Sequence, residues 1–356
     1  MEWDPYMRLR FFILALVLGL AAVACSDDGA SDPVDSEDTS SSESPSTATA
    51  SEPPDGDVDG DDEPADVEVA TRTVEHAFGS SDVPVEPQRI LVIGWRGVLP
   101  ALLDLGFEPI ASQDGTTTFG SPFHPLVTAR AEEAGVETYQ GENLEQIAAL
   151  EPDLIIGAAD FMSESIDQLD EIAPSIGIDW DFENPLNNIQ AIGDAMGVGQ
   201  RAAADIEDFQ SDFERFKERL DDPGQVSIAS FFSYDDLRVV RSGGNWVVTL
   251  VLDLGAEIVP TEEELPADPE LPPGFNFISL EQVGLLSGES LILTGNSGPE
   301  FQAALEEILA ETLVQQLPAV QRDRVLQVDV QLTSGAAGLE GMRVVLDDLE
   351  TFFLDG

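Results

Sequence analysis

Two short sequence patterns each occur twice in this chain, in the same order, and they limit the possible folds more than any other feature. LDLGFE (103–108) is repeated as LDLGAE (252–257), and NLEQIAALEPDLIIG (143–157) is repeated as SLEQVGLLSGESLILTG (279–295). The repeats begin 149 and 136 residues apart. Self-similarity on this scale indicates two copies of one structural unit. We therefore expect two similar lobes with a cleft between them.

Within each copy, short aliphatic runs alternate with helical patterns. RILVIG (89–94) and LIIGA (154–158) are bounded by turn residues, as buried strands are. Residues 97–106 predict a helix that ends at a glycine. Alternating strands and helices favour parallel sheets covered on both faces. We predict the α/β class, with two similar lobes of mostly parallel sheet joined by a long interlobe helix.

The interlobe helix is expected over 200–220. Its apolar residues recur at spacings of three and four, which places them on one face: Ile206, Phe209, Phe213, Phe216 and Leu220. A helix with one apolar stripe fits a strut packed along both lobes, and a peripheral helix of either lobe is the alternative. The predicted division of the chain is a signal segment at 1–25, a tether at 26–70, a first lobe at 71–188, a connecting helix at 189–222 and a second lobe at 223–356.

The N-terminal segment has the pattern of a secretory signal. Arg8 and Arg10 precede an apolar run over 11–24 that is too short to span a membrane comfortably. The run ends in Ala-Val-Ala before Cys25, which resembles a bacterial lipobox. We expect acylation of Cys25 to anchor the protein to the cell membrane, facing outside the cytoplasm. Ordinary secretion with a chance cysteine is the alternative.

The composition of the next segment predicts a tether. Residues 26–70 contain sixteen Asp and Glu and no Lys or Arg. Such a segment cannot bury enough apolar surface to offset its conformational entropy.

The whole chain has 70 acidic and 15 basic residues, a formal net charge of −55. This balance excludes nucleic acid as a partner, because that function needs a basic surface.

Catalytic and metal-binding patterns are missing from the sequence. It contains no G-x-S-x-G, P-loop or H-E-x-x-H motif. The only histidines are His76 and His124, and the only cysteine is Cys25. Transition-metal sites usually need several such ligands. We therefore predict a binding protein with no cofactor and no resident metal, not an enzyme.

Ligands of open α/β sheets bind beyond the carboxyl ends of the strands. Trp95 with Arg96, and Trp246 with Arg241, lie just before the repeated helix of their respective lobes. Two facing aromatic and guanidinium surfaces would hold a bulky polar ligand; the alternative for each Trp is a core position. The predicted ligand-facing residues are Trp95, Arg96, Phe123, His124, Phe161, Tyr234, Arg241 and Trp246.

Glu145 and Glu281 occupy equivalent positions in the second repeated pattern, each at the second position of a predicted helix. A glutamate there complements the helix dipole, and that role alone explains its presence. The functional alternative is that each lobe exposes one carboxylate to dock on an arginine of a partner.

These strings resemble a known family. NLEQIAALEPDLIIG, QLDEIAPSIG, the LDLG joints and the segment 73–95 are similar to the periplasmic binding proteins of siderophore and cobalamin ABC importers, and the similarity extends from about 71 to 354. The resemblance implies two lobes bridged by a rigid helix, and a monomeric lipoprotein that delivers a ferric siderophore to a permease dimer. It also implies that Glu145 and Glu281 dock on arginine pockets of the permease.

The resemblance does not fix the ligand. Family members often have a Trp in the last strand–helix loop, where this chain has Gln331 and Leu332. The negative field of the protein favours a neutral or cationic hydroxamate chelate over a trianionic catecholate. The alternatives are cobalamin, haem or a metal ion as ligand, and a surface interaction protein without a transport role.

Overall fold

The computed structural model describes residues 70–94, 97–113, 123–141, 143–233, 236–241, 245–265, 275–296, 299–333 and 337–355. The chain divides into two compact units, 1–68 and 69–356, and the described residues belong to the second. Four residues that the sequence analysis singled out lie outside the described ranges: Cys25, Trp95, Arg96 and Tyr234.

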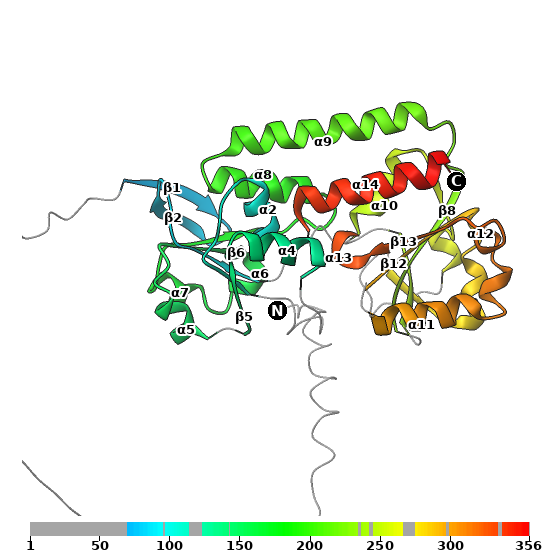
Figure 1. Ribbon diagram of the computed structural model, residues 1–356, viewed down its shortest axis with the longest axis horizontal. Helices are drawn as coiled ribbons and strands as arrows, with labels where there is room; N and C mark the ends of the chain where they lie inside the picture. The colour runs from blue at the N-terminus through cyan, green and yellow to red at the C-terminus, as the bar shows by residue number, and fades with distance from the viewer. Residues whose placement is uncertain are drawn as a thin grey trace, which may run out of the picture. The chain divides into compact units, whose positions relative to one another are not determined.

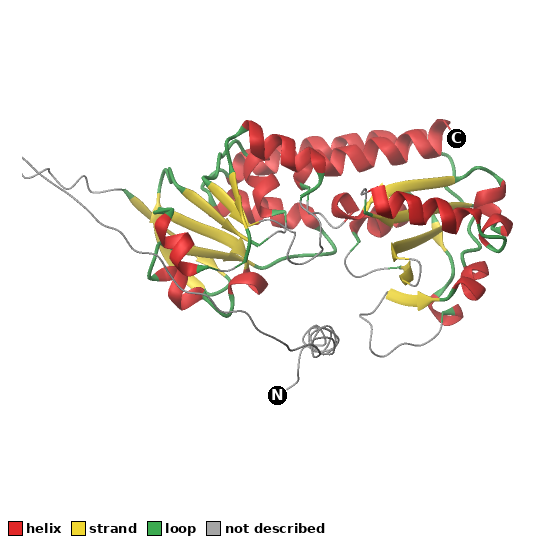
Figure 2. Ribbon diagram, turned by 60° about the horizontal axis from the view of Figure 1, so that its bottom comes forward, coloured by secondary structure: helices red, strands yellow, loops and turns green. Residues whose placement is uncertain are grey.

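The first lobe is built on a five-stranded sheet in the order β5-β4-β3-β6-β7, with all neighbours parallel. Every residue of β3 and β6 is buried, because helices cover both faces, and this explains their continuous aliphatic sequences (Figure 2). The strands are β3 (Ile90–Ile93), β4 (Ala111–Gln113), β5 (Glu137–Tyr139), β6 (Leu154–Ala158) and β7 (Ser175–Ile178). The helices are α2 (Val98–Asp104), α4 (Pro125–Glu133), α5 (Leu144–Ala149), α6 (Ala159–Met162) and α7 (Ile166–Asp170).

An antiparallel hairpin, β1 (Thr71–His76) and β2 (Gly79–Pro84), precedes this sheet and covers its β7 edge. The Ala77 N–H donates to the Gly177 carbonyl at 3.0 Å, and the Ser81 hydroxyl donates to the Ser175 carbonyl at 3.1 Å. The hairpin thus protects an otherwise open sheet edge.

The second lobe has a six-stranded sheet in the order β11-β9-β8-β12-β13, with β10 also pairing with β8. Its strands are β8 (Gln225–Ser233), β9 (Asp236–Val240), β10 (Glu257–Ile258), β11 (Phe275–Ile278), β12 (Ser290–Gly295) and β13 (Val325–Asp329). Its helices are α10 (Trp246–Asp253), α11 (Pro299–Ala310), α12 (Pro318–Gln321) and α13 (Val330–Thr333), with 3-10 turns η1 (Glu262–Glu264), η2 (Leu280–Leu285) and η3 (Val314–Gln316).

The topology confirms the duplication that the repeated strings predicted. The set β4-β3-β6-β7 of the first sheet corresponds to β10-β8-β12-β13 of the second, with parallel pairing throughout. The LDLG strings end α2 and α10, and each leads into a strand beside the central strand of its sheet. Their glycines, Gly106 and Gly255, have φ values of +80° and +94°, which L side chains rarely adopt.

The two lobes differ along the edge of the central strand. In the first lobe, β4 pairs with β3 and carries β5 outside it; in the second, β10 pairs with only two residues of β8, and the antiparallel strand β9 pairs with the rest of that edge. The second repeated string also folds differently in the two lobes, as the α-helix α5 and as the 3-10 turn η2.

Two helices run along both lobes, α9 (Gly199–Arg219) and α14 (Gly338–Asp355), and α8 (Pro185–Ala195) packs against α9 and the first lobe. Figure 1 shows α9 and α14 side by side along the two sheets. The sequence analysis expected one bridging helix and placed 338–354 within the second lobe. In the structure α14 also packs on α2 of the first lobe, so the bridge is doubled.

Apolar packing carries this bridge. The largest cluster of buried side chains runs without a break from Leu99 and Leu102 of α2, through Phe209 and Phe216 of α9, to Ile228 in β8. Buried residues of α14, such as Leu346 and Leu349, belong to the same cluster. Separate clusters fill the opposite face of each sheet. The lobes therefore share one core. Among the described helices, none is both long and apolar enough to cross a membrane.

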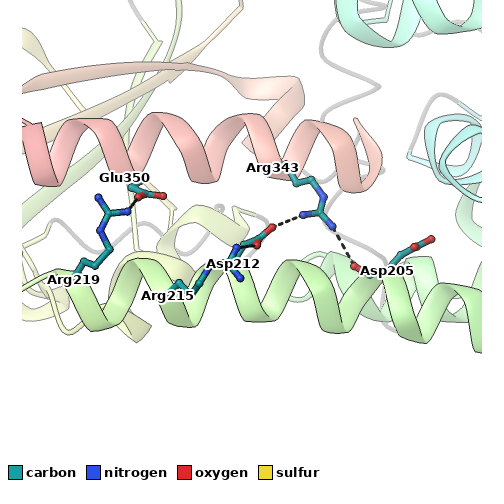
Figure 3. Close-up of polar contacts among 6 residues, drawn as sticks. All are labelled: Asp205, Asp212, Arg215, Arg219, Arg343 and Glu350. Atoms are coloured by element: carbon teal, nitrogen blue, oxygen red, sulfur yellow. Dashed lines mark hydrogen bonds and ion pairs between the residues drawn. The ribbon is translucent and has the colours of Figure 1, made fainter.

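Polar contacts between α9 and α14 lie along the same bridge (Figure 3). Arg343 donates to the Asp212 carboxylate at 2.5 Å and to the Asp205 carbonyl at 3.4 Å, and Arg219 pairs with Glu350. The side chains of Arg343 and Asp212 are 36% and 33% exposed, so solvent screens this pair.

Candidate functional site

A polar cavity lies at the carboxyl ends of the second sheet. β8, β12 and β13 are parallel neighbours, so their carboxyl ends meet at one edge. The cavity there has a volume of about 230 Å³ and an apolar floor that includes Phe231. Its polar lining consists of Thr294, Asn296, Gln302, Gln327 and Asp329. This is the place where open α/β sheets bind ligands.

Asp329 is the one charged residue in the described lining of this cavity. It ends β13, and its Oδ1 accepts the N–H of Gln331 at 2.7 Å, so the carboxylate is held by the first turn of α13. The hydroxyl of Thr294, by contrast, is 2.6 Å from that of Ser230 and is satisfied within the sheet. Amide side chains and one fixed carboxylate are therefore the groups that the cavity offers a ligand.

His124 of the first lobe is not among the residues that line this cavity, but its ring interacts electrostatically with Asp329. Its Nδ1 accepts the N–H of Leu126 at 3.2 Å, capping α4, so the proton of the neutral ring lies on Nε2. Burial lowers the pKa of His124, and the negative charge of Asp329 acts in the opposite direction. The predicted loop histidine is thus a helix cap whose ring presents a donor.

Phe161 closes the carboxyl end of the first sheet. It follows β6 and is half-buried. A Cβ added at Gly94, just after β3, would lie 2.8 Å from the Phe161 Cδ2 atom, so the ring rests directly on this glycine. The Gly94 N–H donates to the Gln113 Oε1 at 2.8 Å. Phe161 therefore lies at the strand ends, as its predicted role requires.

Trp246 does not lie at an open surface, contrary to the prediction of two facing indole walls. It is 2% exposed, its Nε1 donates to the Leu332 carbonyl at 3.0 Å, and its ring packs edge-on against Phe209 of α9 with centroids 6.4 Å apart. Trp246 is the first residue of α10, and its side chain packs against the bridge helix α9, so it belongs to the shared core. The core position that the sequence analysis kept open is the one observed, and Trp95 lies outside the described residues.

Phe123 and Arg241 are also more enclosed than predicted. Phe123 is 7% exposed and belongs to the shared core. Arg241 is half-buried, and its Nη1 donates to the carbonyls of Ile258 and Pro260. A guanidinium has five N–H groups, so these contacts fix the position of Arg241 without using all its donors.

With this geometry in view, a comparison with family models decides the classification. The model of the periplasmic binding protein family matches residues 92–332. The protein is a periplasmic binding protein. The match includes both sheets and α9 of the bridge, so it covers the cavity and both repeated strings, while α14 lies beyond it.

Individual relatives agree with this assignment. The chain is 28% identical over 294 residues to YfiY of Bacillus subtilis, named a probable siderophore-binding lipoprotein, covering 80% of this chain and 88% of YfiY. Among solved structures, SirA of Staphylococcus aureus complexed with staphyloferrin B has a TM-score of 0.62 at 19% identity over 79% of this chain and 98% of SirA. A FhuD fold-family periplasmic binding protein of Bacillus subtilis has a TM-score of 0.63 at 17% identity over 80% and 100%.

The family assignment confirms that this periplasmic binding protein is not an enzyme, as the missing catalytic motifs predicted. It also confirms the α/β class with two mostly parallel sheets. Among the described residues, no group of three or more His, Cys, Asp or Glu is placed to hold a metal ion.

The two glutamates of the repeated string are exposed in this periplasmic binding protein. Glu145 lies in the first turn of α5, where the Asn143 side chain accepts the N–H of Gln146 at 3.1 Å. Glu281 lies in the first turn of η2, and hydrogen bonding from the Ser279 hydroxyl holds the pKa of its carboxyl below the usual value. At both positions an exposed glutamate can complement the helix dipole, and it can also contact a partner protein.

None of the polar residues that line the cavity is among the eight predicted ligand-facing residues. Asp329 ends β13, so the strand-end rule could have found it, and Gln327 lies two residues before it in the same strand. Gln302 comes from α11, and nothing in a helical pattern marks one residue as facing a cavity.

Proposed function

We propose that this protein is the extracytoplasmic binding lipoprotein of an ABC importer, that it captures a ferric siderophore as a monomer, and that it delivers the chelate to a permease dimer. The family assignment supports the importer role, and the names of YfiY and the SirA complex support siderophores as the ligand class. The mechanism is binding and release, without a cofactor.

The observation that carries the ligand proposal is the polar cavity at the strand ends of the second lobe. Its described lining offers amide groups and one carboxylate, with no Lys or Arg. Amides donate and accept, so they suit the carbonyl and N–O oxygens of hydroxamates. An anionic catecholate would find no cationic partner in this lining, and the net charge of −55 opposes it further. We therefore favour a ferric hydroxamate.

Several groups are proposed to contact the chelate from around this cavity. Phe161 lies at the strand ends of the first lobe, His124 interacts electrostatically with Asp329, and Arg241 keeps unused donors. Trp95, Arg96 and Tyr234 follow predicted or observed strands and complete the proposed set. Phe123 and Trp246 are proposed to support it from within the core, because their burial leaves no surface for a ligand.

A ligand screen tests the binding proposal. The purified chain would be melted with ferric hydroxamate, ferric catecholate, ferric citrate, cobalamin, haem and free metal ions. A ligand present at 100 times its dissociation constant stabilises the folded state by about 2.7 kcal/mol, an easily measured rise in Tm. We expect a ferric hydroxamate to give the largest shift. A shift with cobalamin, haem or free metal alone, or with none of them, would contradict the proposal.

Docking is proposed to involve Glu145 and Glu281, one carboxylate from each lobe. The test replaces both, Glu145→Arg with Glu281→Arg, and measures chelate affinity and cellular uptake separately. We expect uptake to be lost while affinity is kept. The matched control reverses the charge of two other exposed glutamates, Glu133→Arg with Glu307→Arg, and should leave uptake intact. Normal uptake in the first variant would remove the docking role.

Acylation of Cys25 is proposed to anchor the protein to the cell membrane. Because Cys25 is the single cysteine of the chain, Cys25→Ala removes the only acceptor without breaking a disulfide. We expect the variant to appear in the soluble extracytoplasmic fraction and to lose incorporation of a labelled fatty acid. Equal labelling of both proteins would contradict this proposal.

A further inference from the structure

The cavity carries a negative charge that no described Lys or Arg pairs with. Asp329 is half-buried at its edge, with Oδ1 bound to the Gln331 N–H. Among the described residues, no Lys or Arg forms an ion pair with it. The remaining polar lining, Asn296, Gln302 and Gln327, is uncharged. A ligand that enters the cavity therefore meets one fixed carboxylate.

The other titratable group of the site does not neutralise this charge. His124 caps α4 through its Nδ1, and burial keeps the pKa of its ring below the ordinary value even though Asp329 raises it. The ring is therefore neutral at neutral pH. It offers an N–H donor but no positive charge to balance the carboxylate.

Only one of the two oxygens of the Asp329 carboxylate has a hydrogen-bond partner among the described residues. Oδ1 holds the first turn of α13, a structural task that an asparagine oxygen would perform equally well. Oδ2 has no partner within the described part of the chain. A cation supplied by a ligand could therefore pair with this oxygen in a charge-assisted hydrogen bond.

Resting on the proposed function, we propose that Asp329 binds a free ammonium group of the chelate and so selects a cationic ferric hydroxamate over neutral and anionic ones. The ammonium donates to the exposed carboxylate oxygen, while the cavity amides bind the neutral part of the chelate. An acylated amine has lost both its charge and two of its donors and cannot make this contact. Asp329 thus determines specificity by binding the ammonium group of the chelate.

The test uses two chelates that differ only at this group: a linear ferric trihydroxamate with a free terminal amine, and the same compound N-acetylated. Dissociation constants are measured by calorimetry for the wild-type chain and for Asp329→Asn, which keeps an acceptor for the Gln331 N–H. For the wild type we expect the free amine to bind at least about tenfold more tightly, a ratio that added salt reduces. In Asp329→Asn the ratio should fall to about one.

A matched control is Glu289→Gln. Glu289 is an exposed carboxylate at the opposite end of β12 from the cavity, paired with Arg322 at 3.9 Å. This change removes the same charge from the same lobe and should leave the tenfold preference intact. Loss of the preference in this variant would assign the effect to overall charge and overturn the role of Asp329.

The remaining outcomes separate this inference from the proposed function. Equal binding of the two chelates by the wild type would overturn the inference while leaving siderophore binding in place. A preference that survives in Asp329→Asn would place recognition of the ammonium elsewhere and overturn it as well. Failure of both chelates, together with every other ferric siderophore, would overturn the proposed function and this inference together.

Discussion

The carboxylate of Asp104, at the end of α2 in the first lobe, accepts a hydrogen bond of 2.6 Å from the backbone N–H of Leu339, in the first turn of α14. It also accepts from Arg130 at 2.7 Å, and Arg130 pairs with Glu340 at 3.0 Å. Asp104 thus satisfies one of the free N–H groups at the start of α14. Because α14 continues into the second lobe, this contact fixes one end of the interlobe bridge.

Removing this contact should destabilise the protein. Asp104→Ala deletes a helix cap and leaves a buried N–H and the Arg130 guanidinium without their partner, so the free energy of unfolding should fall by about 2 kcal/mol. Asp104→Asn keeps an oxygen for the Leu339 N–H and should lose about half as much. Urea unfolding measures both values. Equal losses in the two variants would show that the charge, not the cap, matters.

The same carboxylate predicts a pH dependence. Burial raises the pKa of Asp104 even though Arg130 lowers it. The folded chain therefore binds this proton more tightly than the unfolded chain, so the contribution of Asp104 to stability grows as the pH falls and is lost as the pH rises through the folded pKa. The stability of the wild type relative to Asp104→Asn should increase between about pH 7 and about pH 4. A constant difference in urea unfolding would contradict the shift.

His124 should show the opposite dependence. Its pKa is lowered by burial, so the folded chain binds this proton less tightly, and stability is lost as the pH falls through the ordinary histidine value. His124→Asn keeps a cap for the Leu126 N–H and does not titrate. Thermal melts between about pH 7 and about pH 5 should therefore show the wild type losing stability relative to the variant. Parallel profiles would mean that the ring is not buried as described.

The fold was accessible from the sequence because its information is local and repeated. β6 coincides with the aliphatic run LIIGA, whose bounds were predicted to the residue, and Gly106 of the first LDLG string follows its helix as expected. Because each string occurs twice, the fold predicted from one copy could be checked against the other copy. A pattern that occurs once offers no such check.

The site was less accessible, because burial depends on what the rest of the chain packs against a residue. Trp246 looks like a strand-end aromatic in the sequence, but α9 and α13 enclose it through Phe209 and the Leu332 carbonyl. Those partners are distant in sequence. The same applies to α14, whose attachment to the first lobe includes its packing on α2 and the contact between Asp104 and Leu339.

The buried position of Trp246 predicts how a substitution should behave. Trp246→Phe removes the N–H that satisfies the Leu332 carbonyl and leaves a gap beside Phe209, so the free energy of unfolding should fall by about 2 kcal/mol. The affinity for a ferric chelate should change little, because the indole has no open surface. Calorimetry and urea unfolding measure the two quantities. A large loss of affinity with unchanged stability would restore the predicted ligand-facing role.

The bridge between the lobes allows apolar packing to be compared with surface charge. Arg343→Met breaks the contacts of α14 with Asp212 and Asp205, but these groups are partly exposed, so the loss should stay below about 1 kcal/mol. Leu349→Ala, six residues further along α14, removes a side chain that is fully buried in the shared core. This change should cost about 2–5 kcal/mol. Urea unfolding of both variants measures the two losses of unfolding free energy. A larger loss for Arg343→Met would mean that the ion pairs, not the core, hold the lobes together.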